Sequence, residues 1–403
     1  MDGISRRTAL KIGSATALSF GLGFWQKALA SPAVVGGGPY GALGPPDGFG
    51  VRLPSGFTSR LVAFTGERVG DTDFEWVREP DGAATFATSG DGWIYVANSE
   101  VNGTGGGAAA IRFASNGDIV DAYRILGGTK WNCSGGATPW GTWLSGEEFR
   151  NGNVWECDPT RPGQGVRRPL LGSFAHEAAV VDPATGWVYL TEDDADGRLY
   201  RFRPAMSGNL SKGVLEAAQL DEPGRRVSWA TVRSDRPERL SATTAFNRGE
   251  GAFYSGGFLY FTTTGDDRVW ALRTATGEIE VIYDAAVLGA DAPLRDPDCI
   301  TTHHASGDIF VGEDSDDLQL VLLANGDHQR IAAPFLQLIG HAGGEKGSPG
   351  QDDNVVPSSS WKPTSEITGL AFSPDGTRLY VTSQRGLDGV RGMTFEITGP
   401  FRR

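Results

Sequence analysis

The sequence is poor in cysteine, methionine and basic charge. It has 3 cysteines and 3 methionines in 403 residues, and its 49 Asp and Glu residues outnumber its 36 Lys and Arg residues. Nucleic-acid-binding domains usually carry a basic face, so a net charge of -13 argues against a nucleic-acid partner. A protein this acidic is better suited to attract cations.

The apolar run at residues 12–24 is too short to span a bilayer as a membrane anchor. The run lies between adjacent Arg6 and Arg7 and an Ala-Leu-Ala pattern at residues 28–30, which together predict an export signal over residues 1–30. The paired arginines favour the twin-arginine translocase, and hence a periplasmic or secreted protein. A general secretion signal with two chance arginines is the alternative.

Glycine and aromatic residues are abundant, with 58 Gly, 20 Phe and 11 Trp. This composition favours many short strands joined by tight turns over helical bundles. The length suits two average domains or one large all-β domain. Residues 31–56 are rich in Gly and Pro and predict an irregular lead-in, so we expect a single domain over residues 57–403.

A weak repeat supports the all-β interpretation. In six places a turn is followed by a short aromatic and β-branched run that ends in polar or acidic residues. The copies are DGWIYVANSE from Asp91, GTWLSGEE from Gly141, GWVYLTEDD from Gly186, GGFLYFTTTGDD from Gly256, GDIFVGEDSDD from Gly307 and GTRLYVTSQ from Gly376. Their irregular spacing predicts a six-bladed β-propeller with inserted loops, whose equivalent strand ends converge on one channel.

Carboxylates recur at these strand ends. They are Glu147, Glu148, Glu192, Asp193, Asp194, Asp266, Asp267, Glu313, Asp314, Asp316 and Asp317. Acidic residues at strand ends are often only turn formers, an interpretation that is favoured for Asp266, Asp267, Asp316 and Asp317. Many like charges around one channel would repel one another unless cations neutralise them, so bound calcium or iron is the alternative.

The stretch from Trp131 to Glu148 gathers two kinds of metal ligand. Cys133 stands just before two glycines, which predict a turn, and Glu147 and Glu148 end the short strand that follows. A thiolate favours iron, zinc or copper, and carboxylates favour calcium, magnesium or ferric iron. A small buried cysteine and a solvated pair of glutamates are the alternative.

The odd number of cysteines leaves at least one thiol unpaired in an oxidising compartment. If Cys157 and Cys299 are buried residues or a pair, Cys133 is the leftover thiol, and a metal would protect it from oxidation.

Two further segments carry candidate groups. FAHEAA contains His176 and Glu177, and RGEG contains Arg248 and Glu250. An arginine fork can bind phosphate through two hydrogen bonds, although a salt bridge to one of the many carboxylates is an equal alternative for Arg248. His176 is more often structural than a ligand.

Taken together, five stretches resemble the PhoX-type alkaline phosphatases, a family of bacterial phosphatases exported by the twin-arginine route. The stretches are NCSGGATPWGTWLSGEE, HEAAVVDPATGWVYLTEDD, RGEGAFYSGGFLYFTTTGDD, DPDCITTHHASGDIFVGEDSDD and SEITGLAFSPDGTRLYVTSQRG. They follow one another in order through most of the chain after residue 31.

The resemblance implies a six-bladed propeller whose mouth holds an iron and calcium cluster that hydrolyses phosphate monoesters. Cys133 looks like the cysteine ligand of iron, and Arg248 like the phosphate-binding arginine. The remaining implied metal ligands are Glu177, Glu250, Glu147, Glu148, Glu192 and Asp193. Two alternatives remain open: a calcium-dependent propeller hydrolase of the lactonase type, and a secreted propeller that binds a partner without catalysis.

Overall fold

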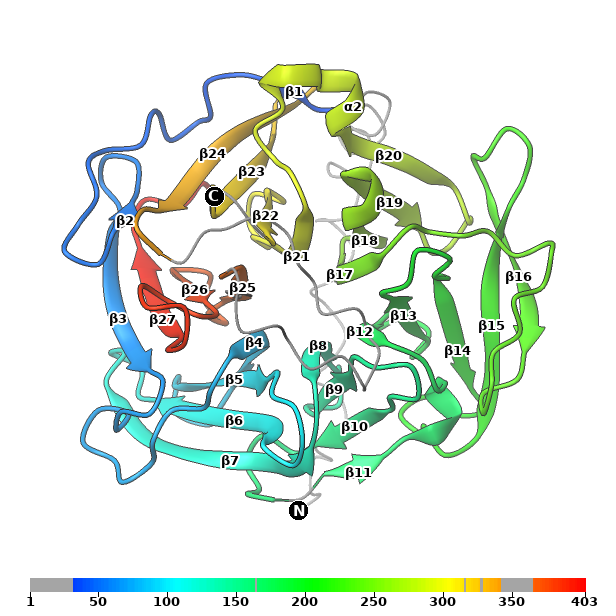
Figure 1. The fold of residues 1–403 in the computed structure, drawn as a ribbon, viewed down its shortest axis with the longest axis horizontal. Coiled ribbons are helices and arrows are strands. Elements are labelled where there is room, and N and C mark those ends of the chain that lie inside the picture. Colours follow the sequence, from blue (N-terminus) through cyan, green and yellow to red (C-terminus); the bar gives the residue numbers. More distant parts are fainter. Residues whose placement is uncertain (1–31, 164, 315–316, 327–328, 342–364) are drawn as a thin grey trace, which may run out of the picture.

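The computed structural model describes residues 32–163, 165–314, 317–326, 329–341 and 365–403. These residues form six β-sheets arranged as blades around a central axis (Figure 1). The predicted six-bladed β-propeller is therefore confirmed. The predicted signal at residues 1–30 lies outside the described residues.

The first three blades follow one another along the chain. Blade 1 contains β4 (Pro80–Ala87), β5 (Trp93–Ser99), β6 (Gly106–Phe113) and β7 (Ile119–Thr129). Blade 2 contains β8 (Asn132–Ala137), β9 (Trp143–Glu147), β10 (Val154–Cys157) and β11 (Val166–Arg167). Blade 3 contains β12 (His176–Val181), β13 (Val188–Glu192), β14 (Tyr200–Pro204), β15 (Gly213–Leu220) and β16 (Val227–Val232).

The other three blades complete the ring. Blade 4 contains β17 (Gly249–Ser255), β18 (Phe258–Thr263), β19 (Arg268–Arg273) and β20 (Ile279–Asp284). Blade 5 contains β21 (Pro297–Thr302), β22 (Ile309–Glu313), β23 (Gln319–Asn325) and β24 (Arg330–Leu338). Blade 6 contains β25 (Ile367–Phe372), β26 (Arg378–Ser383) and β27 (Met393–Thr398), together with β3 (Thr58–Phe64) from the other end of the chain.

Helical structure among the described residues is limited to one turn of α-helix and short 3-10 segments. They are α2 (Ala285–Leu288), η1 (Pro169–Leu171), η2 (Thr264–Asp266) and η3 (Gly289–Asp291). The lead-in at residues 31–56, expected to be irregular, contributes two short strands, β1 (Val34–Val35) and β2 (Val51–Arg52). Both strands pair with β24 at the outer edge of blade 5.

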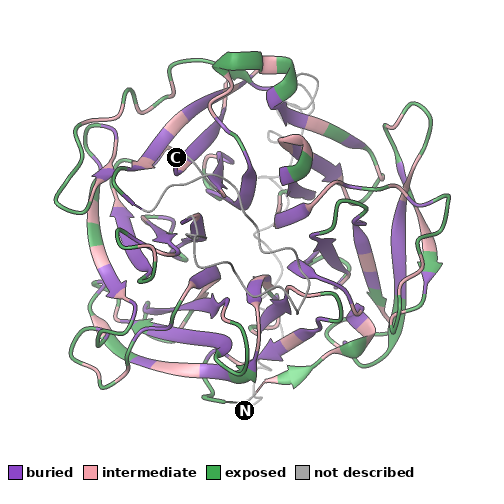
Figure 2. Ribbon diagram, in the orientation of Figure 1, coloured by how far each residue is buried: buried purple, intermediate pink, exposed green. Residues whose placement is uncertain are grey.

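The six sequence repeats correspond to β5, β9, β13, β18, β22 and β26, which are the second strands of the six blades. Their aromatic and β-branched runs are almost wholly buried (Figure 2). Buried on both faces, a strand reads as a continuous apolar run, which is why the repeat is visible in the sequence.

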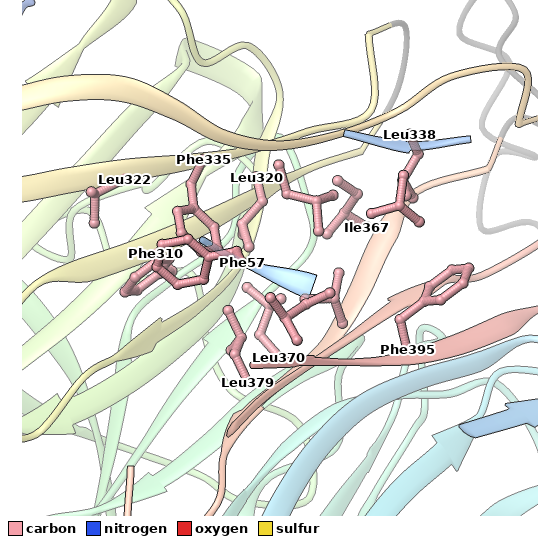
Figure 3. Packing of buried hydrophobic residues seen from close by; sticks show 14 of the residues in the cluster. Phe57, Phe310, Leu320, Leu322, Phe335, Leu338, Ile367, Leu370, Leu379 and Phe395 are labelled. Carbon is pink, nitrogen blue, oxygen red and sulfur yellow. The ribbon is translucent and has the colours of Figure 1, made fainter. Parts of the chain in front are cut away.

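Each pair of neighbouring blades encloses its own cluster of buried apolar side chains in the described part of the chain. Figure 3 shows the cluster between blades 5 and 6, where Phe310 and Phe335 of blade 5 meet Leu379 and Phe395 of blade 6. Phe57, which precedes β3, packs its ring edge-on against Phe335 at 5.1 Å between centroids. This packing fixes the blades relative to one another, and so fixes the groups at the centre.

The innermost strands carry a repeated irregularity. In each of the first five blades, the register between the first and second strands shifts over a three-residue step. The steps are Pro80 to Ala83, Asn132 to Gly135, His176 to Ala179, Gly249 to Ala252 and Pro297 to Ile300. Such a bulge redirects the side chains inside it, and bulges are common beside active sites.

Candidate metal centre

The first residue inside each of these five bulges is an acid or a thiol. The five residues are Asp81, Cys133, Glu177, Glu250 and Asp298, and Thr368 holds the corresponding place in blade 6. Figure 1 shows that the strands concerned, β4, β8, β12, β17, β21 and β25, stand innermost around the axis. A repeated backbone feature therefore aims one potential ligand from each of five blades at the same channel.

The side chains meet in three linked groups whose ligand atoms lie within 4.8 Å of one another. The groups are Asp81, Glu100 and Cys133; Cys133, Glu148 and Glu177; and Glu177, Glu250 and Asp298. Cys133 and Glu177 each belong to two groups, so the three form one continuous set of ligand atoms across blades 1 to 5. All of these residues are buried except the partly exposed Glu148.

A second set of residues follows the second strands. In every blade the residue after that strand donates its backbone N–H to the carbonyl of the residue before the bulge, at 2.7–3.3 Å. The donors are Glu100, Glu148, Asp193, Thr264, Asp314 and Gln384. This backbone bond places a second ring of side chains beside the first.

Backbone strain accompanies this arrangement. The residue before the bulge has a left-handed conformation in four blades, at Glu79 (φ 44), Trp131 (φ 49), Arg248 (φ 53) and Asp296 (φ 45). Non-glycine residues seldom adopt this conformation, and such strain is concentrated at functional sites.

Burial and mutual repulsion act on the acids at the centre. Burial is the larger cause, and neighbouring carboxylates add to it, so that five pKa values are raised well above the usual range. The acids are Asp81, Glu148, Glu177, Glu250 and Asp298. Burial, followed by the charge of Asp81, also raises the pKa of the Cys133 thiol. These groups favour their neutral forms unless positive charge is supplied.

The donor set fits bound cations. The Sγ atom of Cys133 lies 3.4 Å from Oε2 of Glu177. The other carboxylate oxygen of Glu177, Oε1, is buried and has no hydrogen-bond partner within the described part of the chain. A buried oxygen without a donor is costly, and a cation would satisfy it. One thiol among six carboxylates suits a site that takes both a thiophilic metal and a hard cation.

Arg248 lies beside these groups. Its Nε and Nη2 atoms pair with the two oxygens of Asp193 at 2.8 and 3.1 Å, and Nη2 also lies 3.1 Å from Oε1 of Glu250. In this structure Arg248 therefore forms salt bridges to carboxylates, which was the alternative to phosphate binding. The side chain is 27% exposed, so its neighbours cover it only in part.

Glu147 and Glu192 take a different position from the other expected ligands. The carboxylate of Glu147 accepts hydrogen bonds from the backbone N–H groups of Lys130 and Asn153. Glu192 pairs with Arg239 and accepts the Tyr200 hydroxyl. Strand alternation explains this, since the last strand residue and the one after it face opposite ways. Neither residue belongs to the three groups, and their metal role stays a prediction.

The expected turn at Cys133 is wrong. Cys133 lies within β8, and the glycines at 135 and 136 belong to the same strand without positive φ. A Cβ atom at Gly135 would collide with the Leu144 carbonyl, and one at Gly136 with the Ala179 carbonyl of the next blade. The glycines therefore serve close strand packing, not a turn. All three cysteines are unpaired, and Cys157 is buried between blades 1 and 2.

His176 is fully buried, with Nε2 3.2 Å from the Gly172 carbonyl oxygen. Burial lowers its pKa to about 3, so the ring is neutral. This environment is that of a structural histidine.

The sequence interpretation missed Asp81, Glu100 and Asp298. The sequence does contain a signal for Asp81 and Asp298. In the strand before each repeat, the bulge residue is followed by a small residue, as in Asp81-Gly82 and Asp298-Cys299. The small residue is needed because neighbouring inner strands nearly touch. A Cβ atom at Gly82 would lie 2.5 Å from the Ser134 Cα atom.

Glu366, Gln384 and Arg385 complete the centre on the side of blade 6. The side-chain amide of Gln384 donates to Asp81 and, at 2.9 Å, to Glu100. Arg385 pairs with Glu366 at 3.2 Å and with Glu79 at 3.3 Å. On the side of blade 6, an amide and a cation thus accompany the carboxylate of Glu366.

The fold and the site define a β-propeller with a buried thiol and carboxylate centre. Residues 94–278 match the family model described as alkaline phosphatase PhoX. This match confirms the expected resemblance to the PhoX family, a family of phosphomonoesterases, and with it the expected enzyme class.

One of the solved structures that align with the chain shows the same fold. PhoX of Pseudomonas fluorescens in complex with vanadate, a transition state analogue, aligns with a TM-score of 0.68 and 16% identity over 89% of this chain and 97% of that one. A gluconolactonase of Xanthomonas campestris aligns with a TM-score of 0.46 and 13% identity, over 90% of this chain and 99% of that one. No curated protein sequence matches the chain. None of the described helices has the length and hydropathy needed to cross a membrane.

Proposed function

We propose that the protein is an exported phosphatase that hydrolyses phosphate monoesters with iron and calcium bound at the centre. The observation that carries the proposal is the continuous set of ligand atoms from Asp81 to Asp298, with Arg248 beside it. The match of residues 94–278 to the PhoX family model supports the reaction class, and the mixed donor set supports two kinds of metal.

Cys133 and Glu177 would hold iron, because each belongs to two of the groups and together they supply a thiolate and a carboxylate. The outer carboxylates Asp81, Glu100, Glu250 and Asp298 would hold calcium, which prefers oxygen ligands. Bound cations of this kind polarise phosphoryl oxygens and activate water or hydroxide near neutral pH.

The chain's own groups orient the substrate. Arg248 would exchange part of its pairing with Asp193 for the phosphoryl oxygens, and its planar fork matches two of them at once. Thr264 donates its hydroxyl to Oε1 of Glu250 at 2.8 Å, which fixes that carboxylate in place. No nucleophilic Ser or Thr stands out in the sequence.

The test is hydrolysis of p-nitrophenyl phosphate by the metal-loaded protein, compared with a Glu250→Gln variant. We expect the variant to lose at least about 100-fold in kcat, because a carboxylate that holds the centre becomes a neutral amide. Glu313→Gln is the matched control, since that carboxylate accepts the backbone N–H groups of Arg295 and Gln319 and is not among the implied metal ligands. Metal content is measured for all three proteins.

Equal activity in wild type and Glu250→Gln would contradict the proposal. A folded, metal-loaded wild-type protein without phosphatase activity would instead favour a lactonase-type hydrolase or a partner-binding propeller. Cys133→Ser separates those alternatives from the proposal, because neither of them needs the thiolate.

Export rests on residues 1–30 alone. Replacing Arg6 and Arg7 by lysine should leave the precursor in the cytoplasm if the twin-arginine translocase carries it. Fractionation of cells followed by immunoblotting measures the outcome. Normal export of the double variant would show that another route is used.

A further inference from the structure

Trp131 holds the place in blade 2 that Arg248 holds in blade 4. Each stands directly before the bulge of its inner strand, and their φ angles are 49° and 53°. The backbone N–H of Trp131 donates to the carbonyl of Val101, the residue after the second-ring acid of blade 1, at 3.0 Å. That of Arg248 donates to the corresponding carbonyl of blade 3, Asp194, at 2.9 Å. The two side chains therefore leave the backbone at equivalent points beside the centre.

Side chains with this backbone geometry extend toward the preceding blade of the ring. Arg248 pairs with a second-ring acid of blade 3 at 2.8 Å. Glu79, which has the same position in blade 1, pairs with Arg385 of blade 6 at 3.3 Å. The shared geometry directs the indole of Trp131 in the same way, toward blade 1 and its second-ring acid, Glu100.

The backbone of Trp131 is bonded to the metal centre. Its carbonyl oxygen accepts the backbone N–H of Glu148 at 2.7 Å, and Cys133 follows two residues later. Glu148 and Cys133 belong to one ligand group, so Trp131 lies at the rim of that group. Both Trp131 and Glu148 are partly exposed, so solvent reaches this side of the centre. The residues on either side of the bond add an aromatic ring and a cation, since Nζ of Lys130 lies 4.1 Å from the centre of the Phe149 ring.

Packing does not explain why a tryptophan stands at this position. Every other tryptophan among the described residues lies in or against one of the apolar clusters between blades, but Trp131 belongs to none of them. No hydrogen bond or ring contact of its indole joins it to the described part of the chain. A bulky residue at positive φ is also strained, and such strain is concentrated where function requires it.

We propose that Trp131 stacks on the alcohol group of the substrate, so that the enzyme prefers phosphate esters of flat aromatic alcohols. The inference rests on the proposed function and names the class of substrate. Aromatic side chains stack on phenol rings and on nucleobases alike. A phosphoryl group held by Arg248 on blade 4 leaves the partly exposed indole on blade 2 for the rest of the ester. Phenols and nucleosides share the flat ring, and the experiment separates the two.

The experiment measures kcat and KM of wild type and Trp131→Ala with phenyl phosphate, adenosine 5′-monophosphate and glycerol 2-phosphate. We expect the variant to lose about tenfold or more in kcat/KM with at least one of the two aromatic esters, mainly through a higher KM. With glycerol 2-phosphate it should stay within about twofold of wild type, because this ester has no ring to stack. A loss with phenyl phosphate alone places the bound ring directly on the ester oxygen, and a loss with the nucleotide alone places it beyond the ribose.

Three further variants serve as controls. Trp131→Phe keeps a flat ring and should stay within about threefold of wild type with all three esters, whereas Trp131→Leu keeps apolar bulk without a ring and should behave like Trp131→Ala. Trp229→Ala removes another partly exposed tryptophan, which lies on the outer strand of blade 3, β16, with its ring 4.3 Å from the Arg201 guanidinium carbon. This variant should treat all three substrates as the wild type does.

Equal losses with all three substrates would overturn the role of Trp131, and so would unchanged kinetics of Trp131→Ala. Loss of metal from Trp131→Phe would overturn it as well, because the residue would then support the metal centre and not the substrate. Wild-type turnover of glycerol 2-phosphate tests the phosphatase function separately. If the wild type hydrolyses it and the Trp131 variants show no dependence on the alcohol group, only the present inference fails.

Discussion

The acids at the centre make proton release on metal binding a sensitive test of the proposed site. Two ionised groups whose oxygens are 4.8 Å apart repel each other by about 3.5 kcal/mol at an effective dielectric constant of about 20. Protonating a glutamate of pKa 4.5 at pH 7 costs about 3.4 kcal/mol. For an acid with one charged neighbour, the repulsion energy and the free-energy cost of protonation are therefore nearly equal.

Several acids at the centre have more than one such neighbour. Glu177 belongs to two groups, and burial adds further cost to its charged form. At least some of the acids at the centre are therefore protonated in the metal-free protein at pH 7. We expect calcium binding to metal-free protein to release about two protons or more, since the ligands must lose them.

Isothermal titration calorimetry in two buffers of different ionisation enthalpy measures this number. Glu250→Gln should release about one proton fewer than wild type, and Glu313→Gln should match wild type. Calcium binding without any proton release would refute the reasoning, because the carboxylates would then be ionised already. Absence of calcium binding would refute it as well.

The raised pKa values of the acids at the centre also determine how the stability of the protein depends on pH. The folded-state pKa values of these acids lie above those of the unfolded chain, so the folded protein binds more protons. The contribution of these acids to the free energy of unfolding is fully present below about pH 4.5. It is lost as pH rises toward the pKa values of the folded state. The Tm of metal-free protein should therefore fall from pH 5 to pH 8 relative to that of the metal-loaded protein.

Three further predictions concern single side chains. Cys133→Ser should lower iron content while the circular dichroism spectrum stays unchanged; full iron content would show that the thiol is not a ligand. Arg248→Lys should raise KM for p-nitrophenyl phosphate about tenfold, because one ammonium group cannot replace the fork; an unchanged KM would contradict phosphate binding. Gly251→Ala should lower stability by about 1–3 kcal/mol in denaturant titrations, since its Cβ would lie 2.7 Å from the Asp298 carbonyl oxygen; an unaltered midpoint would refute this close packing.

The sequence, together with the family resemblance, pointed to several residues that the structure brings together, although their roles stay predictions. Cys133, Glu177, Glu250 and Arg248 occur in short segments with recognisable chemistry, and all four are found at the centre. Others could not be separated from their neighbours. Glu147 and Glu148 look equivalent in the sequence, yet only Glu148 joins a ligand group.

The reason is that one residue of register decides the direction of a side chain. Glu147 ends β9, and Glu148 lies one step beyond it, so they face opposite sides. The bulges act in the same way on the first strands, since each adds a residue that the alternating pattern does not contain. Asp81 and Asp298 were missed for this reason.

The sequence by itself determined the all-β class, the number of blades and the positions of their second strands, because those strands are buried on both faces and give continuous apolar runs. Only the tertiary structure decided which acids share the centre. Asp81 and Asp298 are more than 200 residues apart in the chain, and ring closure by β3 in blade 6 brings their blades to the same axis. Contacts of this kind depend on the bulges and on packing between blades. The small residue that follows each bulge residue marks a place in one strand, but it does not show which blades meet.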